Sequence, residues 1–269
     1  MQSSFRAYPV GPLTPDYTKA ARLALEVYVG MIPWDANALS ALADLLVSDY
    51  LNRWNEAENN PAAGKHLLRE AELRLEQASA IDSSLPIMYY VKGLILRAKH
   101  QHDAALKEFE TAVALDPNCD FPSYYAQTGN QYVNVGEPAK ALPLVARAIQ
   151  QNHSDPSIGV FYWIKGRAYF FMSTDADYDN AIVWLEKSVA ERPNLWYNRL
   201  YLVSAYALRK RIAEARSALD AFKRYPEFAA FTPATLDAYE KDIPNTHRLV
   251  VAGLDAFHNG LKEVQFWPP

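Results

Sequence analysis

The sequence is poor in cysteine and in long apolar runs, and each shortage excludes a class of protein. The single cysteine, Cys119, rules out an internal disulfide and any site built from several cysteines. No stretch approaches the roughly 18 uninterrupted apolar residues that a membrane-spanning helix needs. The opening residues, MQSSFRAYPVGPL, lack the basic region and apolar core of a signal peptide. We therefore expect a chain without a membrane span that is located in the cytoplasm.

Basic residues are also too few for a nucleic-acid-binding surface. The chain has 27 Lys and Arg against 31 Asp and Glu, which gives a net charge of −4 and a pI of about 5.9. A nucleic-acid platform should instead carry a basic face. Half of the 269 residues are hydrophobic and 13% are aromatic, which is ample for a sizeable core. We expect a folded protein whose partners do not include nucleic acid.

Glycine is scarce as well, at ten residues, and alternating polarity of the β-strand type is hard to find. Apolar residues recur at helical spacing almost everywhere. In the stretch YYVKGLILRAKHQHDAALKEFETAVALDP (89–117), one face of a first helix carries Gly93, and one face of a second helix carries Ala105 and Phe109. The tripeptide HQH makes the turn between them, and Pro117 ends the second helix.

The same offsets recur along the chain at a period of about 34 residues. The earliest copy is a half-copy that matches only a second helix. The third copy has three extra residues before the Pro of QNHSDP, the fourth has three extra residues in the turn STDADYD, and Pro226 comes one residue early in the fifth. The matching residues are Ala21, Leu25 and Pro33; Ala71, Leu75, Ala78 and Asp82; Gly129, Tyr132, Ala141 and Ala148; Gly166, Tyr169, Ala181, Leu185 and Pro193; and Tyr206, Ala215, Leu219 and Pro226.

A repeated helix pair predicts a solenoid, because each pair can bury its apolar face only against its neighbours. The small residues mark the places where two helices approach to the usual ~8–10 Å between their axes. We predict an all-α, right-handed superhelical solenoid of about five helix pairs with a C-terminal capping region. The last helix should cover the end of the solenoid with a stripe made of Leu249, Val250, Leu254 and Phe257.

These residues resemble those of the tetratricopeptide repeat, whose pattern runs W-x2-L-G-x2-Y, then A-x3-F, then P. The copy at 86–119 matches this pattern at Gly93, Ala105, Phe109, Ala112 and Pro117. It departs from the pattern at Tyr89, Lys92 and Leu96, which stand at the positions of its Trp, Leu and Tyr. The resemblance implies a protein-interaction module without a cofactor.

The resemblance divides the chain into three parts: a half-repeat at 1–34, the solenoid at 35–228, and capping helices with a tail at 229–269. The first full copy contains an insertion, LNRWNEAENNPAAG, that we interpret as an extended first helix and a loop. More loosely, the order of elements is similar to the repeat region of bacterial nucleotide-cyclase-like and winged-helix regulators. Their catalytic and DNA-binding domains are absent from this chain, so neither activity is implied.

No residue pattern indicates catalysis or metal binding. His100 and His102 could be written as metal ligands, but a turn between helices accounts for them and a zinc site needs more ligands. There is no G-x-S-x-G elbow and no glycine-rich phosphate loop. The basic run RKR (209–211) fits the end of a first helix, where cations offset the helix dipole. We therefore expect a protein that is not an enzyme.

The candidate site is the groove that the first helices line in tetratricopeptide repeat proteins. Helix phase, carried over copy by copy, assigns the groove to Tyr90, Leu94, Arg97, Asn130, Val133, Trp163, Arg167, Phe170 and Ser204. Aromatic, Arg and Asn side chains together can bury apolar side chains of a peptide and bind its backbone or a carboxylate. The aromatics also fit packing between helices. The Lys of the family's carboxylate clamp is replaced by Ala126.

Three functions remain open on these residues. The first is a module that binds a peptide or a partner helix in the groove, as a monomer or weak homo-oligomer. The second is a sensory domain that binds a small molecule or short peptide, alone or as part of a larger signalling protein; the aromatic content motivates it. The third is a scaffold that associates with itself through its end surfaces or through the tail QFWPP.

Overall fold

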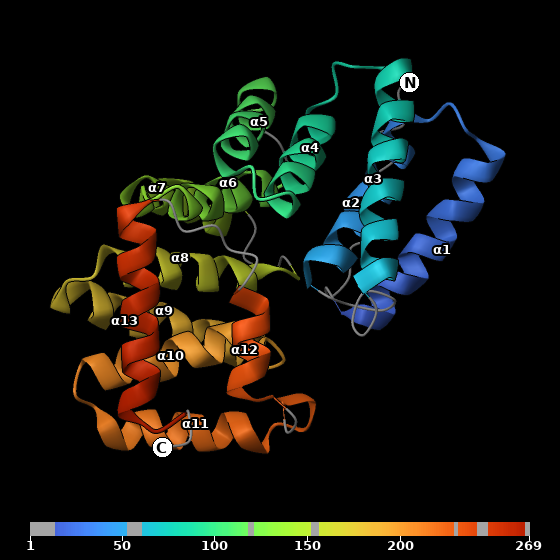
Figure 1. Cartoon of the computed structure of the whole chain (residues 1–269). Coiled ribbons are helices and arrows are strands. Elements are labelled where there is room, and N and C mark those ends of the chain that lie inside the picture. The colour runs from blue at the N-terminus through green and yellow to red at the C-terminus, as the bar shows by residue number, and fades with distance from the viewer. Residues whose placement is uncertain are drawn as a thin grey trace. The chain divides into compact units, whose positions relative to one another are not determined.

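The computed structural model is built from α-helices, shown in Figure 1, and it describes residues 14–52, 61–117, 121–151, 156–228, 231–240 and 247–266. These residues contain no β-strand, and no helix among them is both long and apolar enough to cross a bilayer. The chain divides into two compact units, residues 1–119 and 120–269, which we call unit 1 and unit 2. The predicted boundaries after residues 34 and 228 stay a prediction.

Unit 1 is made of successive packed helices. Within each full repeat the first helix packs on the second, as α2 does on α3 and α4 on α5, while α2 also packs against α1 and α4. The described helices of unit 1 are α1 (Pro15–Met31), α2 (Ala36–Asn52), α3 (Pro61–Ile81), α4 (Pro86–Ala98) and α5 (His102–Leu115).

Unit 2 continues the same scheme with three more pairs. The pairs are α6 with α7, α8 with α9, and α10 with α11, and α7 packs on α8 as α9 packs on α10. Its described elements are α6 (Ser123–Asn134), α7 (Pro138–Gln151), α8 (Ile158–Met172), α9 (Asp175–Glu191), α10 (Trp196–Leu208), α11 (Ile212–Arg224), the 3-10 helix η2 (Pro226–Phe228), α12 (Pro233–Glu240) and α13 (Arg248–Glu263).

The pair α4 and α5 shows why the sequence folds this way. Pro86 opens α4 at a position where its missing N–H costs nothing. The chain reverses at HQH as predicted, and His100 takes the left-handed conformation there with φ of 61°. A Cβ on Gly93 would lie only 2.8 Å from the Phe109 ring. The glycine is therefore what lets the two helices approach, as the repeat pattern predicts.

The extra residues of the fourth copy lengthen a helix. The helix α9 has 17 residues where α5 has 14, so the insertion predicted in a turn instead extends the start of α9. Thr174 caps this start: its hydroxyl accepts a hydrogen bond from the Asp177 N–H at 3.2 Å, and the Asp177 carboxylate accepts one from the Thr174 N–H. This reciprocal capping box stabilises the first turn.

Several predicted features lie outside the described residues. They are the loop of the insertion in the first copy (53–60), Cys119 and its neighbours, the turn at 152–155 and the last three residues of the tail. Phe266, earlier in that tail, is buried and contacts the ring of Phe222 on α11, with 6.5 Å between the ring centroids.

Candidate functional site

In unit 1, the predicted groove residues lie on α4 beside the second helix of their own repeat. Tyr90 and Leu94 are buried, and Arg97 is half-buried. The Tyr90 ring meets the Phe109 ring edge to face at 5.9 Å, and the Arg97 guanidinium lies 5.6 Å from the centre of the same ring. These side chains therefore gather around one buried aromatic of α5.

In unit 2, the predicted residues Arg167 and Asn130 form a buried polar cluster between α8 and α6. Arg167 donates through Nη1 to the Asn130 side-chain oxygen at 2.7 Å and through Nη2 to the Asn134 side-chain oxygen at 2.9 Å. Its guanidinium also stacks 4.8 Å from the centre of the Phe171 ring. Arg167 is only 6% exposed, yet no carboxylate of the described residues forms an ion pair with it.

Burying a cation without a counter-charge is costly, and amide oxygens offset this cost only in part. A guanidinium has five N–H donors, so two bonds to Asn130 and Asn134 leave donors for a further acceptor. Trp163, one turn before Arg167 on α8, also has its indole N–H buried with no hydrogen-bond acceptor among the described residues. Such donors are chemically suited to an anion, and a carboxylate matches the shape of a guanidinium.

Unit 2 covers part of its own first-helix face with α13. This helix packs on α10 and α8, the first helices of two successive pairs, and Figure 1 shows it crossing them. The Ser204 hydroxyl donates to the carbonyl oxygen of Phe257 at 2.9 Å. Phe257 also meets the ring of Phe170 at 6.5 Å. Both Ser204 and Phe170 were predicted to face the groove, and in the structure α13 lies over them.

The stripe predicted for the last helix is buried at three of its four positions. Val250, Leu254 and Phe257 are buried, whereas Leu249 is 49% exposed. The stripe does more than close the last pair, since it spans the first helices of two pairs. Two glycines of α13 could have indicated this position of the helix. Gly253 and Gly260 lie two helical turns apart and contact α8 and α10, respectively.

The predicted groove residues are thus found at three places. One group surrounds Phe109 in unit 1, a second lies in or beside the Arg167 cluster, and a third lies under α13. Apart from Arg97 and Trp163, which are half-buried, all are buried: Tyr90, Leu94, Asn130, Val133, Arg167, Phe170 and Ser204. Asn134 is the residue of the cluster that sequence reasoning missed, although its position one turn after Asn130 could have indicated it.

The outer contacts between the two helices of a pair differ between α4–α5 and α8–α9. In unit 1, Lys92 forms an ion pair with Glu108 at 2.8 Å. The corresponding lysine of α8, Lys165, instead lies over the ring of Trp184, 3.9 Å from its centre, and Lys187 lies 4.4 Å from the centre of the same ring. Burial is the larger cause that lowers the pKa of Lys165, and the neighbouring charge of Lys187 lowers this pKa further.

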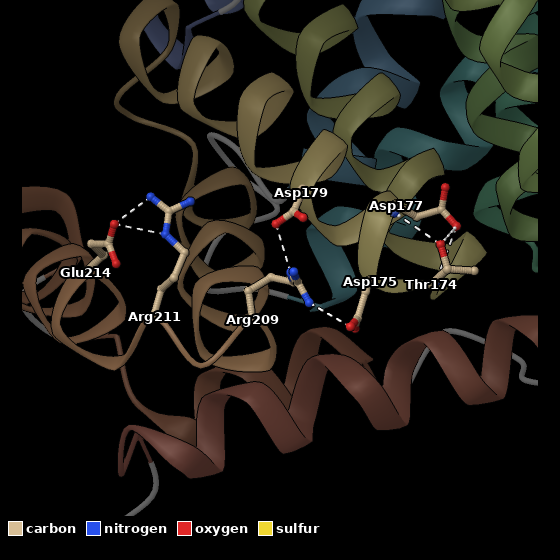
Figure 2. A network of polar contacts seen from close by, with 7 residues as sticks. All are labelled: Thr174, Asp175, Asp177, Asp179, Arg209, Arg211 and Glu214. Carbon is tan, nitrogen blue, oxygen red and sulfur yellow. Dashed lines mark hydrogen bonds and ion pairs between the residues drawn. The ribbon is translucent and has the colours of Figure 1, made fainter.

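A network of carboxylates and arginines links α9 to the turn between α10 and α11 (Figure 2). Arg209 contacts Asp175 at 2.9 Å and Asp179 at 2.8 Å, and the bond to Asp179 is the main cause that raises its pKa. Arg209 is the C-cap of α10, as the helix-end interpretation of RKR predicts. Nearby, Arg211 forms an ion pair with Glu214. These contacts are structural, since all the groups in them are paired with one another.

Comparison with known proteins places this geometry in a class. The tetratricopeptide repeat family model matches residues 87–119, which include α5 and most of α4. The human IFIT1 dimer with m7Gppp-AAAA is similar at a TM-score of 0.59 and 17% identity, over 91% of this chain and 55% of that one. PilW, a widely conserved type IV pilus biogenesis factor, is similar at a TM-score of 0.58 and 15% identity, over 84% of this chain and 92% of that one. The search of curated proteins finds no match.

These findings confirm the predicted class of protein. The chain is an all-α helical-repeat protein, and the repeat that it carries at 87–119 is a tetratricopeptide repeat. The likeness to IFIT1 and PilW establishes the fold alone, because both identities are low, and the chain spans about half the length of IFIT1. Stacked helical repeats of this kind form the extended surfaces on which repeat proteins bind their partners.

Proposed function

We propose that the chain is a non-catalytic interaction module that binds a partner peptide through the first helices of unit 2, with Arg167 binding a carboxylate of that peptide. The observation that carries this proposal is a buried guanidinium whose hydrogen-bond acceptors among the described residues are both side-chain amide oxygens. The indole N–H of Trp163 adds a second buried donor beside it. The net charge of −4 favours a peptide over a nucleic acid as the partner.

The face available to a peptide is limited by α13. Because α13 lies on α8 and α10, Ser204 and Phe170 are covered by the chain itself. The proposal therefore assigns the peptide to the start of the face, where α6 and α8 carry Asn130 and Arg167. The partner must place its negative charge there, since a carboxylate accepts two parallel N–H bonds from one guanidinium.

The test uses peptides selected from a random library for binding to the full chain. Each Asp, each Glu and the terminal carboxyl of a selected peptide is changed to its amide, one at a time. One of these changes should weaken binding to the wild type at least about tenfold. The same peptide change should have little effect on the Arg167→Gln variant, because the charge that it contacts is gone. Arg216→Gln, an exposed change on α11, is the matched control.

Circular dichroism and thermal melting should first show that Arg167→Gln is folded. A folded variant that still loses tenfold when the carboxylate is removed would contradict the role of Arg167. Failure of every selected peptide to bind the wild type would contradict the interaction module itself. The experiment therefore distinguishes a wrong role for Arg167 from a wrong function for the chain.

A further inference from the structure

The outer face of α1 carries the most exposed large apolar side chains of the described residues. Leu23 is 51% exposed, Val27 64%, Met31 66% and Trp34, just beyond the helix, 68%. The first three follow one another at four-residue spacing and so lie on one face of the helix. Single exposed apolar residues are common, but a contiguous row of them marks an interaction site.

The repeat architecture does not explain this row. Superposing the prolines that follow α1 and α5 places Leu23 at the position of Lys107 and Val27 at the position of Thr111. In α5 this face is the outer one: Lys107 is exposed and Thr111 bonds only within its own helix, to the Lys107 carbonyl. A first helix completing the half-repeat would therefore leave Leu23 and Val27 in solvent. The repeat scheme supplies no element that covers them.

The row is complementary to itself when two copies of α1 run antiparallel across Val27. Leu23 precedes Val27 by four residues and Met31 follows it by four. In such a pair, Val27 meets its own equivalent on the two-fold axis, and Leu23 of each copy meets Met31 of the other. A two-fold interface requires this reciprocity, because one patch must fit itself.

The smaller residues of α1 obey the same relation. Ala24 and Gly30 are equally far from Val27, so two small residues face each other and let the helices approach. A Cβ on Gly30 would find no atom within 4 Å, which shows that this face is open.

The charges at the ends of the row are also compatible with this pairing. Asp35 lies beyond the end of α1 and takes no part in the row, because its carboxylate accepts hydrogen bonds from the Tyr28 hydroxyl and the Ala38 N–H. Glu26 flanks the axis, and its carboxylate already contacts Arg22 at 3.9 Å. No pair of like charges is therefore brought together without a partner of opposite sign.

From these observations we infer that the chain forms a two-fold homodimer through antiparallel packing of α1 from two copies, centred on Val27. The occupant of this face is a second copy rather than an unrelated helix, because small and large residues alternate symmetrically about one residue. The inference is independent of the peptide site, which lies in unit 2. The two can succeed or fail separately.

The test places charge on the two-fold axis of the full chain. Sedimentation velocity of the wild type should show a reversible dimer, and Val27→Glu should weaken it at least about a hundredfold, because two like charges then meet. Val27→Lys should do the same, whereas an equimolar mixture of the two variants should form dimers again. Val183→Glu, at a residue of α9 that is 47% exposed, is the matched control and should dimerise like the wild type.

A second variant tests the register. The double change Leu23→Glu and Met31→Lys on one chain should retain dimers in dilute salt, because each charge meets its opposite across the pair, while either single change should not. A wild type that stays monomeric up to millimolar concentration overturns the inference. This holds even if Val27→Glu weakens binding to a different protein. A dimer that Val27→Glu leaves intact, or a failure of the mixed variants to pair, also overturns the inference.

Discussion

The hydroxyl of Ser204 on α10 donates a hydrogen bond of 2.9 Å to the carbonyl oxygen of Phe257 on α13, and Gly260 packs beside it. This contact fixes α13 on the first-helix face of unit 2. A Cβ on Gly260 would lie 2.6 Å from the Ser204 carbonyl oxygen, which belongs to the backbone and cannot rotate away. The glycine is therefore required for α13 to lie this close to α10.

Gly260→Ala should lower the free energy of unfolding by about 1–3 kcal/mol, the usual cost of inserting a methyl into a packed contact. Urea denaturation followed by circular dichroism measures this change. Asn259→Ala, an exposed position one residue earlier on α13, is the control and should change stability by less than about 0.5 kcal/mol. If Gly260→Ala were as stable as the wild type, the packing of α13 on α10 described here would be wrong.

The helix pairs could be predicted from the sequence because each repeat fixes its own packing. Gly93 and Phe109 are set by one local pattern, and the structure places them in contact as that pattern predicts. Such contacts span few residues and recur, so several copies reinforce the same interpretation. The all-α class and the turn at HQH follow from the same local information.

The position of α13 could not be predicted in this way, since it depends on contacts between distant segments. Ser204 and Phe257 are 53 residues apart in sequence and belong to no shared repeat. Helix phase alone assigned Ser204 to an open groove. The burial of Arg167 likewise depends on Asn134, 33 residues earlier in the preceding pair. Which face of a repeat remains open is therefore a property of the assembled unit.

Removing the Arg209 side chain should lower the melting temperature of the chain, because Arg209 joins Asp175 and Asp179 of α9 to the end of α10 (Figure 2). The effect should be small, since Asp175 and Asp179 are 84% and 54% exposed. It should shrink further in ~1 M salt, where screening acts over about 3 Å. Differential scanning calorimetry of Arg209→Ala at low and high salt measures both effects.

Arg216→Ala is the control for this experiment, because Arg216 is exposed on α11 and takes no part in the network. Its melting temperature should follow that of the wild type at both salt concentrations. An Arg209→Ala destabilisation that is independent of salt would show that Arg209 acts through packing of its apolar stem rather than through its ion pairs.

Removing the charge of Lys187 should raise the pKa of Lys165. Burial lowers this pKa most, and the Lys187 charge lowers it further, so Lys187→Gln should move it only part of the way to the ordinary lysine value. NMR titration of the Lys165 side-chain amine measures the shift. Lys223→Gln, an exposed change on α11, should leave the titration of Lys165 where it is in the wild type.

The same change should alter how stability depends on pH. Because the folded-state pKa of Lys165 lies below its unfolded value, the unfolded chain binds more protons between these two values, and stability rises with pH across that window. Lys187→Gln narrows the window, so the rise should become smaller. An unchanged pKa of Lys165 in this variant would mean that the two ammonium groups, although both lie over the Trp184 ring, do not interact, and that burial alone lowers the pKa.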